Sequence, residues 1–305
     1  MSVFRFLVTT SAALLMAAAV SAAPRLFAVN PFNNGTEAQP QSAKALGPGD
    51  YGFYEINATT GAIVASRIIT VPGRTITGAV ALTADPTSGA LYAVAKASGV
   101  SGGGRLLLTI NPDTAVGVEI GNLGDNFSSL AFRSDGQLFG VTGDGATVPE
   151  TLYLINKANA AKTLATTLGN GADGEVIAFN PNDNSFYHFS GGGTTVYERV
   201  LATAPYTVTP ISASLGAGGE IFGAVWDSTR NAFLVSNIAS ELRTVTSTGT
   251  ASAPIVTFPT DLRGMALLAE VPPRVVPTLD GGTLALLVLM AASVGVFAAR
   301  RRRKV

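Results

Sequence analysis

Five acidic side chains stand in four loops at equivalent places in the sequence, each loop leading into a short apolar run, and could act together in one site. They are Asp125, Asp173, Glu175, Glu220 and Asp261. Carboxylate oxygens are the ligands that hard cations such as Ca²⁺ prefer. Two carboxyl groups at a suitable separation could instead be the acid and the base of a glycosidase. The third alternative is that all five are solvated loop carboxylates that form no site.

Hydrolysis is the only catalytic chemistry that this set favours, and Glu175 and Glu220 are the carboxylates to test on a glycan or a lactone. The chain has one histidine and no cysteine, which excludes a thiolate metal site and a site built from several histidines. That histidine, His188, stands between Tyr187 and Phe189 in a predicted strand, where packing is the simpler interpretation. We therefore expect a binding or scaffolding protein, with a hydrolase as the competing hypothesis.

The elements that must position these carboxylates are repeated pairs of apolar runs. Residues 128–145 (SSLAFRSDGQLFGVTGDG) predict a strand, a Ser-Asp-Gly turn and a second strand. Similar units occupy 78–95, 176–191 and 222–237. The alanines of the first strands recur 42 to 50 residues apart, at Ala81, Ala131, Ala178, Ala224 and Ala266. This period is typical of a four-stranded propeller blade.

The two ends of the repeated region complete one another. Residues 25–32 resemble a second strand that lacks its partner, and residues 262–268 resemble a first strand. Both belong to one blade if the chain closes a circle, which removes exposed sheet edges. Third strands are predicted at 53–57, 106–111, 152–156, 195–200 and 241–246. Fourth strands are predicted at 63–70, 116–120, 162–168, 206–212 and 254–258. The predicted fold class is all-β, a five-bladed β-propeller over residues 23–270.

Composition agrees with this fold and excludes one class of partner. Of the 305 residues, 34 are glycine and only 13% are charged, which suits a β-rich chain with many turns. Between residues 24 and 270 there are 13 Lys and Arg against 19 Asp and Glu, a net charge of −6. An acidic body with no basic stripe is not expected to bind nucleic acid.

Both ends of the chain carry targeting patterns. Residues 1–22 have one charge, an apolar run and small residues before Ala22, which predict a secretory signal peptide. Residues 271–282 are a Pro-rich spacer, and the uncharged run 283–299 predicts a transmembrane helix. The basic tail, 300–305, predicts a cytoplasmic end through Arg300, Arg301, Arg302, Arg303 and Lys304.

Two resemblances to known families follow from these motifs. The paired-strand units are similar to YVTN- and NHL-type propeller repeats, which implies the fold and leaves the function open. The spacer motif, followed by the apolar run and the arginines, resembles the IPTL-CTERM sorting signal, a relative of the PEP-CTERM signals of Gram-negative bacteria. The motif residues are Val276, Pro277, Thr278 and Leu279.

The second resemblance implies recognition by an exosortase-type membrane protease and cleavage near the motif. We therefore expect export across the inner membrane, anchoring by the C-terminal helix, and delivery to the cell surface or matrix. The propeller would bind or scaffold an exopolysaccharide or an envelope protein there. No cofactor is expected, with Ca²⁺ at the acidic residues as the open alternative.

Overall fold

The computed structural model describes residues 24–33, 51–101, 104–168, 175–191, 196–213, 215 and 219–268. They fall in one compact unit, Pro24–Ala269. The predicted signal peptide, sorting motif, transmembrane helix and basic tail lie outside the described residues, as does Asp173. Within the described ranges, the chain forms no helix with the length and apolar character that crossing a bilayer requires.

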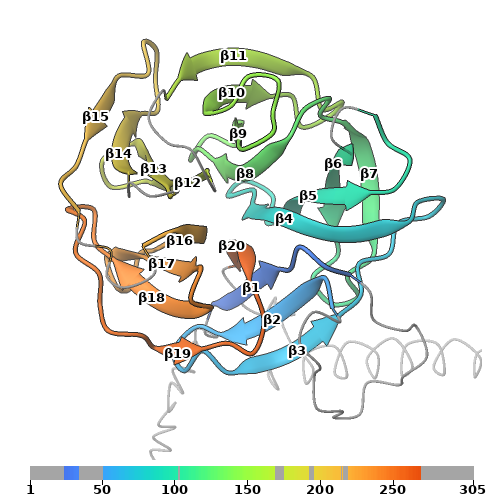
Figure 1. Cartoon of the computed structure of the whole chain (residues 1–305), viewed down its shortest axis with the longest axis horizontal. Helices are drawn as coiled ribbons and strands as arrows, with labels where there is room; N and C mark the ends of the chain where they lie inside the picture. Colours follow the sequence, from blue (N-terminus) through green and yellow to red (C-terminus); the bar gives the residue numbers. More distant parts are fainter. Residues whose placement is uncertain are drawn as a thin grey trace, which may run out of the picture. The chain divides into compact units, whose positions relative to one another are not determined.

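The described strands form five antiparallel sheets of four strands each, arranged as blades around a centre (Figure 1). The first blade contains β20 (Arg263–Leu268), β1 (Arg25–Val29), β2 (Phe53–Asn57) and β3 (Ile63–Arg67). The second contains β4 (Ile76–Ala84), β5 (Leu91–Ala97), β6 (Arg105–Ile110) and β7 (Gly117–Asn122). The third contains β8 (Phe127–Phe132), β9 (Leu138–Thr142), β10 (Thr151–Ile155) and β11 (Lys162–Thr167). The fourth contains β12 (Val176–Asn180), β13 (Ser185–Ser190), β14 (Val196–Leu201) and β15 (Val208–Pro210). The fifth contains β16 (Ile221–Asp227), β17 (Ala232–Asn237), β18 (Glu241–Val245) and β19 (Val256–Thr257).

The predicted closure of the ring is confirmed. Strand β1, near the N-terminal end of the propeller, pairs with β20 on one side and with β2 on the other. Phe27 thus stands opposite Ala266 in one ladder and opposite Glu55 in the next. Main-chain hydrogen bonds between β1 and β20 therefore join the two ends of the propeller, and neither edge of β1 is left unpaired.

The hydrophobic core is divided into five clusters, and each lies between two neighbouring blades. Between the third and fourth blades, the rings of Phe139 and Phe186 are 4.6 Å apart. Between the fourth and fifth, Tyr187 and Phe233 are 4.9 Å apart. Burying one such side chain contributes about 2–3 kcal/mol. The blades are therefore held together by large apolar side chains on both faces of each sheet.

Small residues occur where the five innermost strands converge. The predicted alanines Ala81, Ala131, Ala178, Ala224 and Ala266 all lie in these strands and are all buried. A Cβ on Gly264 of β20 would come within 2.4 Å of the Leu82 nitrogen in β4, so only glycine fits there. The crowded centre thus selects small side chains, as the repeat predicted.

The register of the fifth blade departs from the predicted repeat. The alanines of the first four blades pack toward the following blade, whereas Ala224 packs into the cluster shared with the preceding one. A bulge between Ile221 and Gly223 at the start of β16 shifts its pairing with β17. Strand β8 has the equivalent bulge, between Phe127 and Ser129, so the bulge does not by itself explain the reversed face of Ala224.

The outermost strands of the last two blades are shorter than predicted. Strand β15 has three residues and β19 has two, against the predicted ranges 206–212 and 254–258. Pro254 falls inside the predicted range but outside β19, because proline lacks the N–H that a ladder needs. An outer strand is also an edge strand, so ending it early limits the exposed edge.

Candidate functional site

A cavity of about 180 Å³ opens at the end of the central channel where the innermost strands begin. We call this end the entry face. Its charged lining residues are Asp144, Glu175, Glu220, Arg105 and Arg263, and Phe222 adds an aromatic ring. The cavity therefore has an acidic wall, formed by the three carboxylates, and a basic wall, formed by the two arginines.

Of the predicted acidic set, Glu175 and Glu220 line this cavity together. Asp125 is buried beside it, and its Oδ1 accepts hydrogen bonds from the main-chain nitrogens of Asn126 (2.9 Å) and Thr147 (2.8 Å). Asp261 pairs with Arg263, with 3.0 Å between Oδ2 and Nη2. The side chain of Asp125 thus holds a loop and that of Asp261 an arginine. Of the four members of the predicted set that the structure describes, the entry cavity collects two.

The acidic wall rests on a buried network that sequence reasoning missed. His188 of β13 is completely buried between two glutamates. Its Nδ1 lies 3.2 Å from Glu198 Oε2, and its Nε2 is hydrogen-bonded to Glu175 Oε2. Ser190 donates a 2.8 Å hydrogen bond to Glu175 Oε1. Glu175 is therefore engaged through both of its carboxylate oxygens.

Strand pairing brings this network together. His188 stands directly opposite Glu198 in the β13–β14 ladder, and Glu175 immediately precedes β12, the other neighbour of β13. Ser190 follows His188 by two residues, so both side chains lie on the same face of β13. The sequence placed His188 and Glu198 on two neighbouring predicted strands. That they stand opposite one another follows only once the register of the two strands is known.

The network favours a charged imidazole. Burial lowers the pKa of His188, but the hydrogen bonds to Glu175 and Glu198, together with their negative charges, outweigh it and raise the pKa above its ordinary value. An imidazolium between two carboxylates leaves one negative charge on the buried group. The network also affects a residue outside it. Burial first, and then the negative charge of Glu175, raise the pKa of Glu150.

The arginines of the basic wall have fewer hydrogen-bond partners within the described part of the protein than Glu175 has. Arg105 donates a 2.7 Å hydrogen bond from Nε to Asn126 Oδ1, whereas its buried Nη1 has no partner among the described residues. Burial and then the charge of Arg263 lower the pKa of Arg105. Arg263 lies over the ring of Phe222, with 4.2 Å from its guanidinium carbon to the ring centroid.

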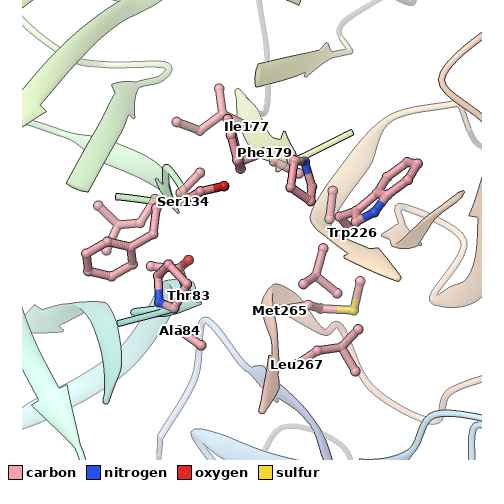
Figure 2. Close-up of a pocket in the computed structure, with 16 residues that line it drawn as sticks. Thr83, Ala84, Ser134, Ile177, Phe179, Trp226, Met265 and Leu267 are labelled. Atoms are coloured by element: carbon pink, nitrogen blue, oxygen red, sulfur yellow. The ribbon is translucent and has the colours of Figure 1, made fainter. Parts of the chain in front are cut away.

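A second cavity, of about 210 Å³, lies at the other end of the channel, which we call the exit face. Figure 2 shows its lining, with Thr83, Phe179, Trp226 and Met265 around the opening. Every innermost strand contributes to it, and most of the lining is apolar. Trp226 also packs on Phe233 at 4.9 Å, as expected for an aromatic residue in the core. The charged side chains of the channel are thus gathered at the entry face.

No described group of three or more His, Cys, Asp or Glu side chains has the arrangement of a metal site. Asp144, Glu175 and Glu220 are the carboxylates that line the entry cavity, and they share it with Arg105 and Arg263. Two guanidinium groups in the same cavity oppose cation binding.

Comparisons with known proteins add a likeness of fold. No protein-family model matches the sequence, and no curated protein is similar to it. TolB from Acinetobacter baumannii is 13% identical, with a TM-score of 0.46, over 76% of this chain and 53% of that one. A protein of unknown function from Bacteroides thetaiotaomicron VPI-5482 is 14% identical, with a TM-score of 0.41, over 75% of this chain and 49% of that one. The chain spans about half the length of each of these two structures, and at these identities the likeness concerns the fold alone.

Proposed function

We propose that this protein is a binding protein of the bacterial cell envelope that holds an extracellular or envelope ligand in the entry cavity without transforming it. The observation that carries the proposal is the state of Glu175. This carboxylate lines the cavity but is bonded to His188 and Ser190, and its side chain is almost fully buried. A general acid or base must reach the reacting group of the substrate, and both oxygens of this carboxylate are already hydrogen-bonded within the protein.

Export and sorting are part of the same proposal and rest on the sequence. A signal peptide at 1–22 would direct the chain across the inner membrane of a Gram-negative bacterium. The motif Val276–Leu279, the apolar run 283–299 and the basic tail would then present the chain to an exosortase-type protease. The intact mass of the mature protein from its native cells tests this step. We expect a C-terminus near residues 276–280, and a mass that retains residues 283–305 would contradict sorting.

The competing function is a hydrolase, and one observation favours it. Glu175 and Glu220 line the same cavity, as the two carboxylates of a glycosidase must. Purified full-length protein and its Glu220→Gln variant should be assayed for released sugar or acid on panels of glycans and lactones. We expect no activity from either protein. Turnover by the wild type that Glu220→Gln abolishes would establish the hydrolase instead.

The binding function itself is tested with the same panel used as ligands. Full-length protein in detergent should retain at least one extracellular glycan or envelope component on an array, and prior saturation with that soluble ligand should abolish the signal. Retention of nothing on the panel would contradict the proposal.

A further inference from the structure

Beside the basic wall of the entry cavity, two cations face one another across a single strand ladder. Lys96 of β5 stands directly opposite Arg105 of β6 in the β5–β6 ladder. Like charges directly opposite one another destabilise a sheet. Neither side chain forms an ion pair with a carboxylate of the described residues, while Arg263 is paired with Asp261. The cross-strand pair is therefore without an ion pair, although the Lys96 Nζ lies 5.6 Å from the centroid of the Phe32 ring and the charge of Asp261 favours the charged lysine.

These cations act on one another through partly buried surroundings. Burial first, and then the charges of Arg105 and Arg263, lower the pKa of Lys96. The pKa of Arg105 is lowered in the same way by burial and by Arg263. Burial is the larger cause of both shifts, and the remainder shows that these cations lie close enough to repel one another. Arg105 and Arg263 line the cavity, and Lys96 lies beside Arg105 on the neighbouring strand.

The other wall limits which anion fits. Asp144, Glu175 and Glu220 line the same cavity, so a ligand that carries several negative charges meets repulsion there. A ligand with one negative charge and several hydroxyl groups avoids this conflict. Its carboxylate would pair with guanidinium groups, and its hydroxyls would donate to carboxylate oxygens.

From this arrangement we propose that the entry cavity binds a hydroxylated monocarboxylate, of the kind found in the uronic acid units of acidic polysaccharides, through Arg105 and Arg263. This inference rests on the proposed binding function and specifies the ligand class of the same cavity. Lys96 strengthens the local potential without lining the cavity. The Arg263 guanidinium is positioned for this role by its contacts with Phe222 and Asp261.

Calorimetric titration of the full-length protein tests the assignment with three probes: a glucuronate oligomer, the matching neutral glucose oligomer, and inorganic phosphate. The test variant is Arg105→Gln, which keeps a planar donor for Asn126. The matched control is Arg74→Gln, which removes an arginine whose partner is Glu119 on the exposed surface. Thermal unfolding of each variant checks that the fold is kept, and we expect no loss of stability from Arg105→Gln.

We expect the glucuronate oligomer to bind the wild type and Arg74→Gln equally, and to bind Arg105→Gln at least about tenfold more weakly, as for one lost charge-assisted hydrogen bond. Phosphate that binds more tightly than glucuronate would overturn the monocarboxylate assignment. Equal binding of the neutral oligomer, unaffected by Arg105→Gln, would overturn the anion site while leaving the binding function intact. Binding of none of these probes, together with an array that retains nothing, would contradict both.

Discussion

The two walls of the entry cavity carry opposite charge and differ in how that charge is satisfied. On the acidic wall, Glu175 is bonded to His188 and Ser190, and Glu198 completes the network behind it. On the basic wall, Arg263 is paired with Asp261, but Arg105 has no carboxylate paired to it among the described residues. Nor has Lys96, which stands opposite Arg105 in the ladder and does not line the cavity. Charge that is fully bonded inside a protein holds structure, whereas charge without a protein partner is available to a ligand.

The largest expected effect comes from breaking the acidic network. His188→Leu leaves Glu175 and Glu198 buried without their shared cation, so we expect a loss of about 3–5 kcal/mol in the free energy of unfolding. Urea unfolding followed through the fluorescence of Trp226, the single tryptophan, measures it. Adding Glu175→Gln and Glu198→Gln to the same variant removes both buried charges and should restore more than half of the loss. A loss below about 1 kcal/mol for His188→Leu would show that the network is not structural.

Stability should also depend on pH through His188. Because its pKa is raised in the folded protein, its contribution is complete below the ordinary histidine value of about 6.5 and falls as the pH rises through the raised value. We expect the urea midpoint of the wild type to fall as the pH rises above neutrality, and to fall less in the triple variant. Identical pH profiles for the two proteins would contradict a charged imidazole.

Removing a charge beside the basic wall should raise the free energy of unfolding, whereas breaking the acidic network should lower it. Lys96→Gln removes one of two like charges that face each other across a ladder, so we expect a gain of about 0.2–1 kcal/mol in the free energy of unfolding. Arg74→Gln, which removes an exposed pair with Glu119, should instead lose between about 0 and 1 kcal/mol. If Lys96→Gln destabilises the protein, the contact between Lys96 Nζ and the Phe32 ring outweighs the repulsion, and the comparison of the two walls fails.

The smallest expected effect is that of calcium. Because Glu175 is already bonded and two arginines share the cavity, we expect neither millimolar Ca²⁺ nor a chelator to move the thermal unfolding midpoint. A rise with Ca²⁺ that Glu220→Gln abolishes would restore the cation site that the acidic residues first suggested.

The fold was largely readable from the sequence because its signals are local. Turn chemistry marks the strand ends: Asn57, the last residue of β2, and Asn111, just after β6, each accept main-chain hydrogen bonds where the sequence predicts turns. The pairing of β1 with β20 followed from two incomplete repeat units at opposite ends. Such features depend on residue type and spacing alone.

The site was less readable because it depends on register. His188 was interpreted as a packed strand residue, and its partner Glu198 is visible only when the β13–β14 pairing is known. Lys96 and Arg105 lie at strand ends, where nothing in the sequence sets them opposite one another. Glu175 was expected in a loop beside the channel and does line the cavity, but its bonds to His188 come from tertiary structure.

The most direct test of the comparison is to locate a monovalent anion in the molecule. Crystals of the protein soaked in bromide would show, by anomalous scattering, where such an anion binds. We predict a bromide within hydrogen-bonding reach of the Arg105 or Arg263 guanidinium in the entry cavity, absent from crystals of Arg105→Gln. Bromide found only on the outer surface, with the entry cavity empty in the same crystals, would contradict the claim that the basic wall is open to a ligand.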